Sequence, residues 1–308
     1  MDKKLNYVSE SYELISVIFR LAGNWEYNIG AGGLEGTEYP LSDEQYVELA
    51  KCDITNGYQL EVSQTFKPFI NHEAVKYAKS LEMGFSEPFR FAVHTEKKGD
   101  EFVFIEDTNS LIGGGWEKES AEHFLNLFNA FYKDAGYAKF YASHIPYFED
   151  ISQRFYDDFY STVDFDWYAK YVDISNLRCV LSPSNSAANY AVTVNEKIIY
   201  GMVRVSSASI LLHEFNHSFA NPLADKWYAE NEEFKKWCDN SVNVEKMPYY
   251  GDGISMAREY VTHAYEVLYE FQHGGDWKKA ILSIKNSAFE DAFPYIEEIY
   301  NMVLNLED

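Results

Sequence analysis

The chain has 308 residues, 46% of them hydrophobic and 17% aromatic, which is enough for one large folded domain or two smaller ones. Its net charge of −23 argues against a nucleic acid or an anionic membrane as a partner, because both are bound through basic surfaces. No apolar stretch of the sequence approaches the length of a transmembrane helix.

The cysteines and the N-terminal sequence indicate a cellular compartment. Cys52, Cys179 and Cys238 are odd in number and widely spaced, which is typical of reduced thiols rather than of a disulfide framework. Near the N-terminus, Glu10 and Glu13 interrupt the apolar residues that a signal peptide would need. We therefore expect a soluble, cytoplasmic protein.

The first half of the chain is predicted to be mainly helical. Ser9 to Ala22 is predicted as an amphipathic helix capped by its first serine, and Ser42 to Lys51 as a second helix. A third helix is predicted from Asn71 to Met83, capped by its first residue. A long helical tract is predicted from Lys118 to Tyr171. The glycine-rich stretch Gly30 to Gly36 lacks the spacing of a phosphate-binding loop and is predicted to be an ordinary loop.

Two regions are predicted to form strands. Phe89 to Asp107 is predicted as a hairpin that turns at Lys97 to Asp100. Leu177 to Ser182 and Tyr190 to Val205 are rich in β-branched residues and predict two or three strands, with a turn near Asn195-Glu196. In zinc peptidases, strands next to the active-site helix commonly hold an extended peptide, but an ordinary structural sheet explains these strands equally well.

The stretch from Ser206 to Pro222 contains the pattern H-E-x-x-H and is predicted to be a helix that starts at a capping serine and ends at Asn221-Pro222. His213 and His217 stand on one helix face and can bind the same metal ion. Glu214 lies about 100° further round, where it can reach a water without binding the metal. The pattern therefore predicts two ligands and a separate base of a zinc hydrolase, although two core histidines would also fit.

A catalytic zinc site needs a third protein ligand. A third histidine in the pattern H-E-x-x-H-x-x-G-x-x-H is excluded, because Ala220 and Leu223 occupy the glycine and histidine positions. Asp225 follows His217 by eight residues and is a possible ligand, but it comes after the expected end of the helix.

The favoured third ligand is Glu259, in a predicted helix from Ile254 to Gln272. Glu259, His263 and Glu266 share one face of that helix. Glu266 is the alternative ligand, and His263 is a possible partner of the ligands or a donor to the transition state. A solvated face of charged residues would also produce this pattern.

A peptidase also needs a donor that stabilises the oxyanion. Tyr249, Tyr250, Tyr260 and His263 are the candidates, and His263 and Tyr250 are our first choices.

The chain resembles a bacterial family catalogued as domain of unknown function 4932, whose members look like gluzincin-type metallopeptidases. The resemblance implies that His213, His217 and Glu259 bind zinc and that Glu214 is the base. It spans roughly residues 9 to 269 and rests on the segments YELISVIFRLAG, NHEAVKYAKSL, FLNLFNAFYKDAGYAKFY, HEFNHSFANP and AREYVTHA. HEFNHSFANP is the specific one among these segments.

Two positions depart from the family pattern. Asn216 stands where the family has a small residue, and His263 stands where a basic arginine is expected. The second departure leaves open which residue acts as the transition-state donor.

These observations predict an α+β fold that is predominantly helical, with a zincin-like metallopeptidase core and a small β-sheet before the HExxH helix. Residues 1–170 are expected to form a mainly helical N-terminal part and residues 171–308 the catalytic part, or both to form one continuous domain. The expected function is that of a Zn²⁺-dependent metallopeptidase acting on a peptide or protein substrate. The alternatives are a zinc hydrolase of other amides or esters and a non-catalytic binding protein on a zincin scaffold.

Overall fold

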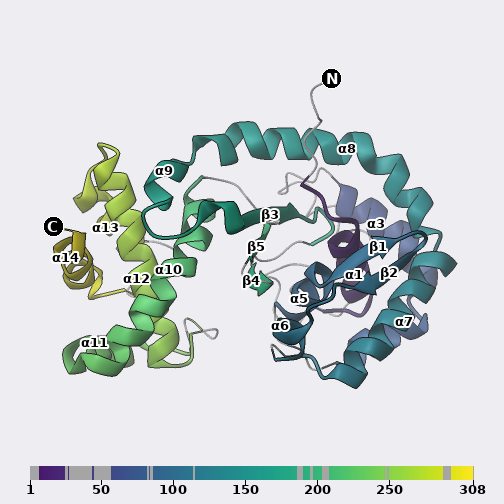
Figure 1. Cartoon of the computed structure of the whole chain (residues 1–308), viewed down its shortest axis with the longest axis horizontal. Helices are drawn as coiled ribbons and strands as arrows, with labels where there is room; N and C mark the ends of the chain where they lie inside the picture. Colours follow the sequence, from purple (N-terminus) through teal and green to yellow (C-terminus); the bar gives the residue numbers. More distant parts are fainter. Residues whose placement is uncertain are drawn as a thin grey trace. The chain divides into compact units, whose positions relative to one another are not determined.

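The computed structural model divides the chain into two compact units, and the described parts of both are predominantly helical, as the sequence predicts (Figure 1). Unit 1 comprises residues 1–162 and 175–206, and unit 2 comprises residues 163–174 and 207–308. The described residues are 7–24, 27, 44, 57–81, 83, 86–113, 115–185, 190–194, 197–202, 208–245, 247, 250–286 and 293–307. The predicted loop at 30–36, the capping serines at 206 and 207, and the predicted helix at 42–51, apart from Glu44, lie outside them.

Unit 1 is built around helix α1 (Glu10–Leu21), which packs against several other helices and is buried along almost its whole length. The predicted cap is confirmed, because the Ser9 side chain accepts a hydrogen bond from the backbone N–H of Tyr12. The predicted helix and its apolar stripe are confirmed, but its polar face is not turned to solvent, because Glu13 and Arg20 are buried as well. The other helices of this unit are α3 (Tyr58–Phe66), η2 (Lys67–Phe69), α4 (Glu73–Ser80), α5 (Glu87–Val93), α6 (Asn109–Ile112), α7 (Lys118–Asp134), α8 (Tyr137–Asp158) and η3 (Tyr160–Thr162).

The Glu13 carboxylate is held inside unit 1 by four hydrogen bonds. Its Oε1 accepts from the Ser182 hydroxyl at 2.6 Å and from the Ser184 backbone N–H at 2.9 Å. Its Oε2 accepts from the Ser184 hydroxyl at 2.5 Å and from the Tyr58 hydroxyl at 2.9 Å. Burial raises the pKa of Glu13, and these hydrogen bonds only partly oppose that rise.

Three strands of unit 1 form a mixed sheet in the order β3-β5-β4. β3 (Leu177–Leu181) is parallel to β5 (Lys197–Met202), which is antiparallel to β4 (Tyr190–Val194). The prediction of two or three strands is therefore confirmed.

The predicted domain boundary after residue 170 differs from the division into units. Leu181 of β3 donates its backbone N–H to the Tyr7 carbonyl and accepts from the Ser9 N–H, so the sheet belongs with unit 1. Residues 163–174, with α9 (Phe165–Tyr168), belong to unit 2. The turn η4 (Ile174–Asn176) lies where the chain passes from one unit to the other.

Three other predictions for unit 1 need correction. The hairpin is shorter than predicted, with β1 (Thr95–Lys98) and β2 (Glu101–Phe104); the apolar run before it is helix α5, in whose first turn Pro88 fits. Helix α4 is capped by the His72 ring, which accepts from the Ala74 N–H, and not by Asn71. The long helical tract is divided at Gly136, whose φ of 61° is a left-handed conformation that favours glycine.

Unit 2 is organised around α12 (Gly253–Gln272), which packs against α10 (Ala208–Glu230), α11 (Glu232–Ser241), α13 (Trp277–Lys285) and α14 (Ile296–Glu307) (Figure 1). On the apolar face of α12, Val261 and Leu268 are fully buried, whereas Phe271 near the end of the helix is exposed. The predicted end of the HExxH helix is wrong: α10 continues past Pro222, which is exposed and removes a single backbone hydrogen bond. None of the described helices combines the length and apolar character that a membrane span requires.

Candidate metal centre

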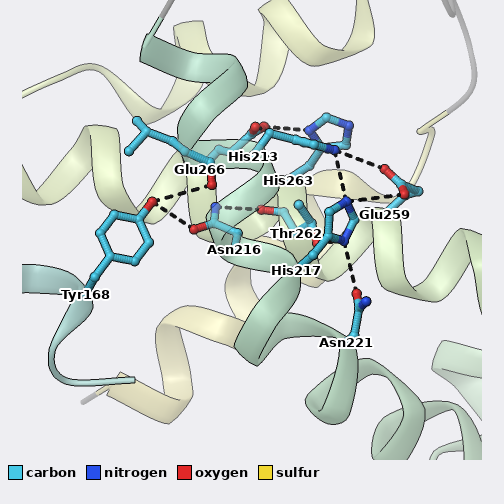
Figure 2. A network of polar contacts seen from close by, with 10 residues as sticks. Tyr168, His213, Asn216, His217, Asn221, Glu259, Thr262, His263 and Glu266 are labelled. Carbon is cyan, nitrogen blue, oxygen red and sulfur yellow. Dashed lines mark hydrogen bonds and ion pairs between the residues drawn. The ribbon is translucent and has the colours of Figure 1, made fainter. Parts of the chain in front are cut away.

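Three side chains from α10 and α12 bring their ligand atoms together (Figure 2). His213 and His217 lie one turn apart on α10, and their Nε2 atoms are 3.2 Å apart. Glu259 of α12 faces both rings: its Oε2 is 3.4 Å from Nε2 of His213, and its Oε1 is 3.6 Å from Nε2 of His217. The predicted ligands His213, His217 and Glu259 therefore converge on one point.

The spacing of these atoms fits a zinc ion. Zinc binds imidazole nitrogen and carboxylate oxygen at about 2.0–2.2 Å, so two ligands of a tetrahedral site are separated by roughly 3.3–3.5 Å. The two Nε2 atoms are 3.2 Å apart, and each ring has one Glu259 oxygen nearby, Oε2 at 3.4 Å from His213 and Oε1 at 3.6 Å from His217, so the separations are close to this value. Glu259 is buried, which rules out the alternative that it belongs to a solvated charged face. The donor set of two imidazoles and one carboxylate is also one that zinc commonly takes.

Glu266, the alternative ligand, has a different environment. Its Oε1 lies 3.0 Å from Nδ1 of His213, and its Oε2 lies 2.6 Å from Nδ1 of His263. A separation of 2.6 Å is typical of a charge-assisted hydrogen bond and is too short for two ligands of one zinc ion. Although His213, His263 and Glu266 form a second group of possible ligands, their spacing is that of hydrogen bonds.

The second ligand, His217, is held on its far side by two polar side chains. Its Nδ1 lies 3.0 Å from Oδ1 of Asn221, one turn further along α10, and 3.0 Å from Oγ1 of Thr262 on α12. An Nδ1–H that donates to either oxygen leaves Nε2 as the nitrogen that faces Glu259. Neither partner is predicted above, although Asn221 follows His217 by four residues and helical spacing alone places it beside His217.

Asn216 connects the HExxH helix to two other segments of unit 2. Its side chain is fully buried; its Nδ2 donates to the Thr262 carbonyl at 3.2 Å, and its Oδ1 accepts from the Tyr168 hydroxyl at 3.0 Å (Figure 2). These bonds join α9, α10 and α12. They account for a fully buried asparagine at this position.

The charges of the site favour a cation. Burial by itself lowers the pKa of His213, but Glu266 and Glu259 outweigh burial and raise it well above its ordinary value. Burial opposes ionisation of Glu266, but His263 and His213 lower its pKa to about 2. The pKa of Glu259 is likewise lowered, because the bond to His213 and the neighbouring histidines outweigh burial. The carboxylates thus stabilise positive charge where the three ligand atoms meet.

The predicted base, Glu214, and the predicted donor Tyr250 both interact electrostatically with residues of the metal site. Burial raises the pKa of Glu214, and the charges of His213 and His217 oppose that rise. The pKa of the Tyr250 hydroxyl is raised by burial and further by the charges of Glu259 and Glu214.

The other candidates are the possible donors Tyr260 and Tyr249 and the possible ligand Asp225. Tyr260 is buried, and its hydroxyl bonds with Ser241 and accepts from the Tyr295 backbone N–H, so it does not serve the site. Asp225 is paired with Arg258. Tyr249 lies outside the described residues.

Comparisons of the chain with family models, with curated proteins and with solved structures find no match.

Proposed function

We propose that the chain is a zinc-dependent peptidase and that unit 2 is its zincin-like catalytic unit. The observation that carries the proposal is the convergence of His213 Nε2, His217 Nε2 and the Glu259 carboxylate, whose two oxygens face one ring each at separations close to those between the ligands of a zinc ion. Glu214 adds a carboxylate that is not among these ligand atoms. A site that only held a structural metal would have no use for it.

His213, His217 and Glu259 would hold the zinc ion, which supplies Lewis acidity to a water and to the scissile carbonyl. Glu214 takes a proton from the water while the water oxygen attacks the carbonyl carbon. When the carbon–nitrogen bond breaks, Glu214 transfers that proton to the leaving amine. His263 and Tyr250 are the proposed donors to the negative oxygen that forms during the attack. The products are a carboxylic acid and an amine, as cleavage of a bond in a peptide or protein substrate requires.

The metal is tested by elemental analysis of the wild-type protein and of Glu259→Ala, both after incubation with zinc and removal of the excess. We expect about one zinc per chain in the wild type. The variant should lose most of its zinc, because only two of the three protein ligands, the histidines, remain. Arg258→Ala, which changes the neighbouring residue on α12, is the matched control and should keep its zinc. A wild-type protein that binds no zinc would contradict the proposal and would favour the binding-protein alternative.

The chemistry is tested with a library of fluorogenic peptides and with Glu214→Gln, which keeps the shape of the side chain but is not a base. We expect the variant to keep about one zinc per chain and to lose peptidase activity by a factor on the order of 10²–10⁴. Glu230→Gln, at the exposed end of α10, is the control. Near-wild-type activity in Glu214→Gln would rule out its role as base. Cleavage of simple amides or esters without cleavage of any peptide would identify the other class of zinc hydrolase.

A further inference from the structure

We infer that Glu266 is a positioning residue that fixes the orientation of two histidines at once, the ligand His213 and the candidate donor His263. The inference rests on the proposed function and adds to it a physical connection between the metal ligands and the transition-state donor.

The geometry assigns one carboxylate oxygen to each ring. Oε1 of Glu266 is 3.0 Å from Nδ1 of His213, and Oε2 is 2.6 Å from Nδ1 of His263. An ionised carboxylate only accepts hydrogen bonds, so each Nδ1 must carry a proton. The remaining nitrogen of each ring is Nε2. In His213 this is the atom that faces Glu259 and His217, as metal binding requires.

His263 has little freedom to leave this arrangement. It lies three residues before Glu266 on α12, and its ring packs edge-on against Phe293 with 4.7 Å between ring centroids. The centroid of the His213 ring is 4.9 Å from the centroid of the His263 ring. The side chains of Glu266 and His263 are 18% and 19% exposed, so water competes weakly for their hydrogen bond.

The two histidines come from different helices, and Glu266 joins them. His213 is on α10, whereas His263 and Glu266 are on α12. If Glu266 holds both rings, a change at one histidine must alter how well Glu266 serves the other. This coupling distinguishes a shared positioning residue from a carboxylate that only fills space.

The experiment measures zinc affinity by competition with a chromophoric chelator in the wild type and in Glu266→Gln, Glu266→Asp and Glu270→Gln. The glutamine amide offers one acceptor oxygen, and its NH2 group faces the second imidazole N–H. We expect Glu266→Gln to bind about one zinc per chain at saturation, with an affinity 10–100-fold lower. Aspartate keeps both acceptor oxygens and should restore part of the affinity. Glu270→Gln, one turn further along α12 and exposed, should match the wild type.

The bridge itself is tested by repeating the Glu266→Gln substitution in a His263→Ala background. There the glutamine oxygen has only His213 to accept from, so the loss of zinc affinity should be several-fold smaller than in the wild-type background. An equal loss in both backgrounds would overturn the shared role. Loss of the bound zinc itself in Glu266→Gln, with zinc retained in Glu259→Ala, would make Glu266 the ligand.

The outcomes separate this inference from the proposed function. Unchanged zinc affinity in Glu266→Gln overturns the inference and leaves the peptidase proposal standing. A wild-type protein that binds zinc and shows the expected coupling, but cleaves no peptide, supports the inference and contradicts the peptidase proposal. A wild-type protein that binds no zinc overturns both.

Discussion

Asp225 and Arg258 form a bidentate ion pair that joins α10 to α12 about two helical turns beyond His217. Nε of Arg258 donates to Oδ1 of Asp225 at 2.8 Å, and Nη2 donates to Oδ2 at 3.0 Å. Both carboxylate oxygens of Asp225 are therefore engaged by a guanidinium group. This pairing removes Asp225 from the set of residues that could complete the metal site.

The first prediction concerns Asp225→Ala. Both partners of the ion pair are more than 40% exposed, so water screens it, and we expect a loss of only about 0.5 kcal/mol in the free energy of unfolding. Denaturant titration would measure that loss. Zinc content should stay at the wild-type value, and a loss of zinc in this variant would show that Asp225 is a ligand after all.

The second prediction concerns the two acceptors at Nδ1 of His217. One proton on Nδ1 can be accepted by Asn221 or by Thr262, each 3.0 Å away, so either acceptor can replace the other. We expect Asn221→Ala and Thr262→Val each to lower zinc affinity only a few-fold, and the double variant to lower it about 10–100-fold. Chelator competition measures all three variants.

A matched control for the double variant is Ser218→Ala, whose hydroxyl donates to the Phe215 carbonyl within α10 and does not touch His217. Its zinc affinity should equal that of the wild type. If the two single variants have effects that simply add in free energy, Asn221 and Thr262 act independently and the idea of interchangeable acceptors is wrong.

The sequence predicted the centre of this site better than its surroundings. Residues four apart on a helix share a face, so H-E-x-x-H predicts the approach of His213 and His217 from local geometry alone. The position of Glu259 follows from the requirement for a third ligand on a neighbouring helix. The partners of the ligands depend on how α10 crosses α12. For that reason Thr262, 45 residues from His217, could not be identified from the pattern.

The errors in the fold have similar physical causes. Pro222 is a local stop signal that costs a helix about 3 kcal/mol, but α10 continues through it because its packing against α12 and α11 favours the helix over its 23 residues. Glu13 is polar, and an amphipathic helix would turn it toward solvent, yet Ser182 and Ser184 supply its hydrogen bonds from far along the chain. Neither outcome can be inferred from a window of neighbouring residues.

The third prediction concerns the buried link from Tyr168 through Asn216 to Thr262. Asn216→Ala removes a donor and an acceptor and leaves the Thr262 carbonyl with one partner fewer, so we expect a loss of about 2–3 kcal/mol in the free energy of unfolding. Tyr168→Phe removes one hydroxyl and should cost about 1 kcal/mol. Denaturant unfolding measures both.

Because Tyr168 and Asn216 share a hydrogen bond, the double variant should lose less stability than the sum of the two single variants. Tyr171→Phe is the control, since Tyr171 packs its ring on Phe219 at 4.7 Å and lies on the same segment as Tyr168. Strict additivity between Tyr168→Phe and Asn216→Ala would show that the hydrogen bond contributes nothing measurable.

The fourth prediction is that Glu13 makes the free energy of unfolding depend on pH. Glu13 lies in unit 1, whereas the candidate metal ligands lie in unit 2. Burial raises the pKa of Glu13 in the folded protein above its value in the unfolded chain. The folded state therefore binds the proton more tightly than the unfolded state does. Glu13 therefore stabilises the folded state fully at pH values below its pKa in the unfolded chain. This stabilisation is lost as the pH rises through its pKa in the folded protein.

The measurement compares wild type with Glu13→Gln, which is neutral at every pH, by denaturant unfolding from pH 4 to pH 8. The wild type should lose stability relative to the variant as the pH rises, with a slope of at most about 1.4 kcal/mol per pH unit. Glu101→Gln, on the exposed side of β2, is a control for removal of one charge. If the wild type instead gains stability relative to Glu13→Gln with rising pH, the four hydrogen bonds outweigh burial and hold Glu13 ionised at a lowered pKa.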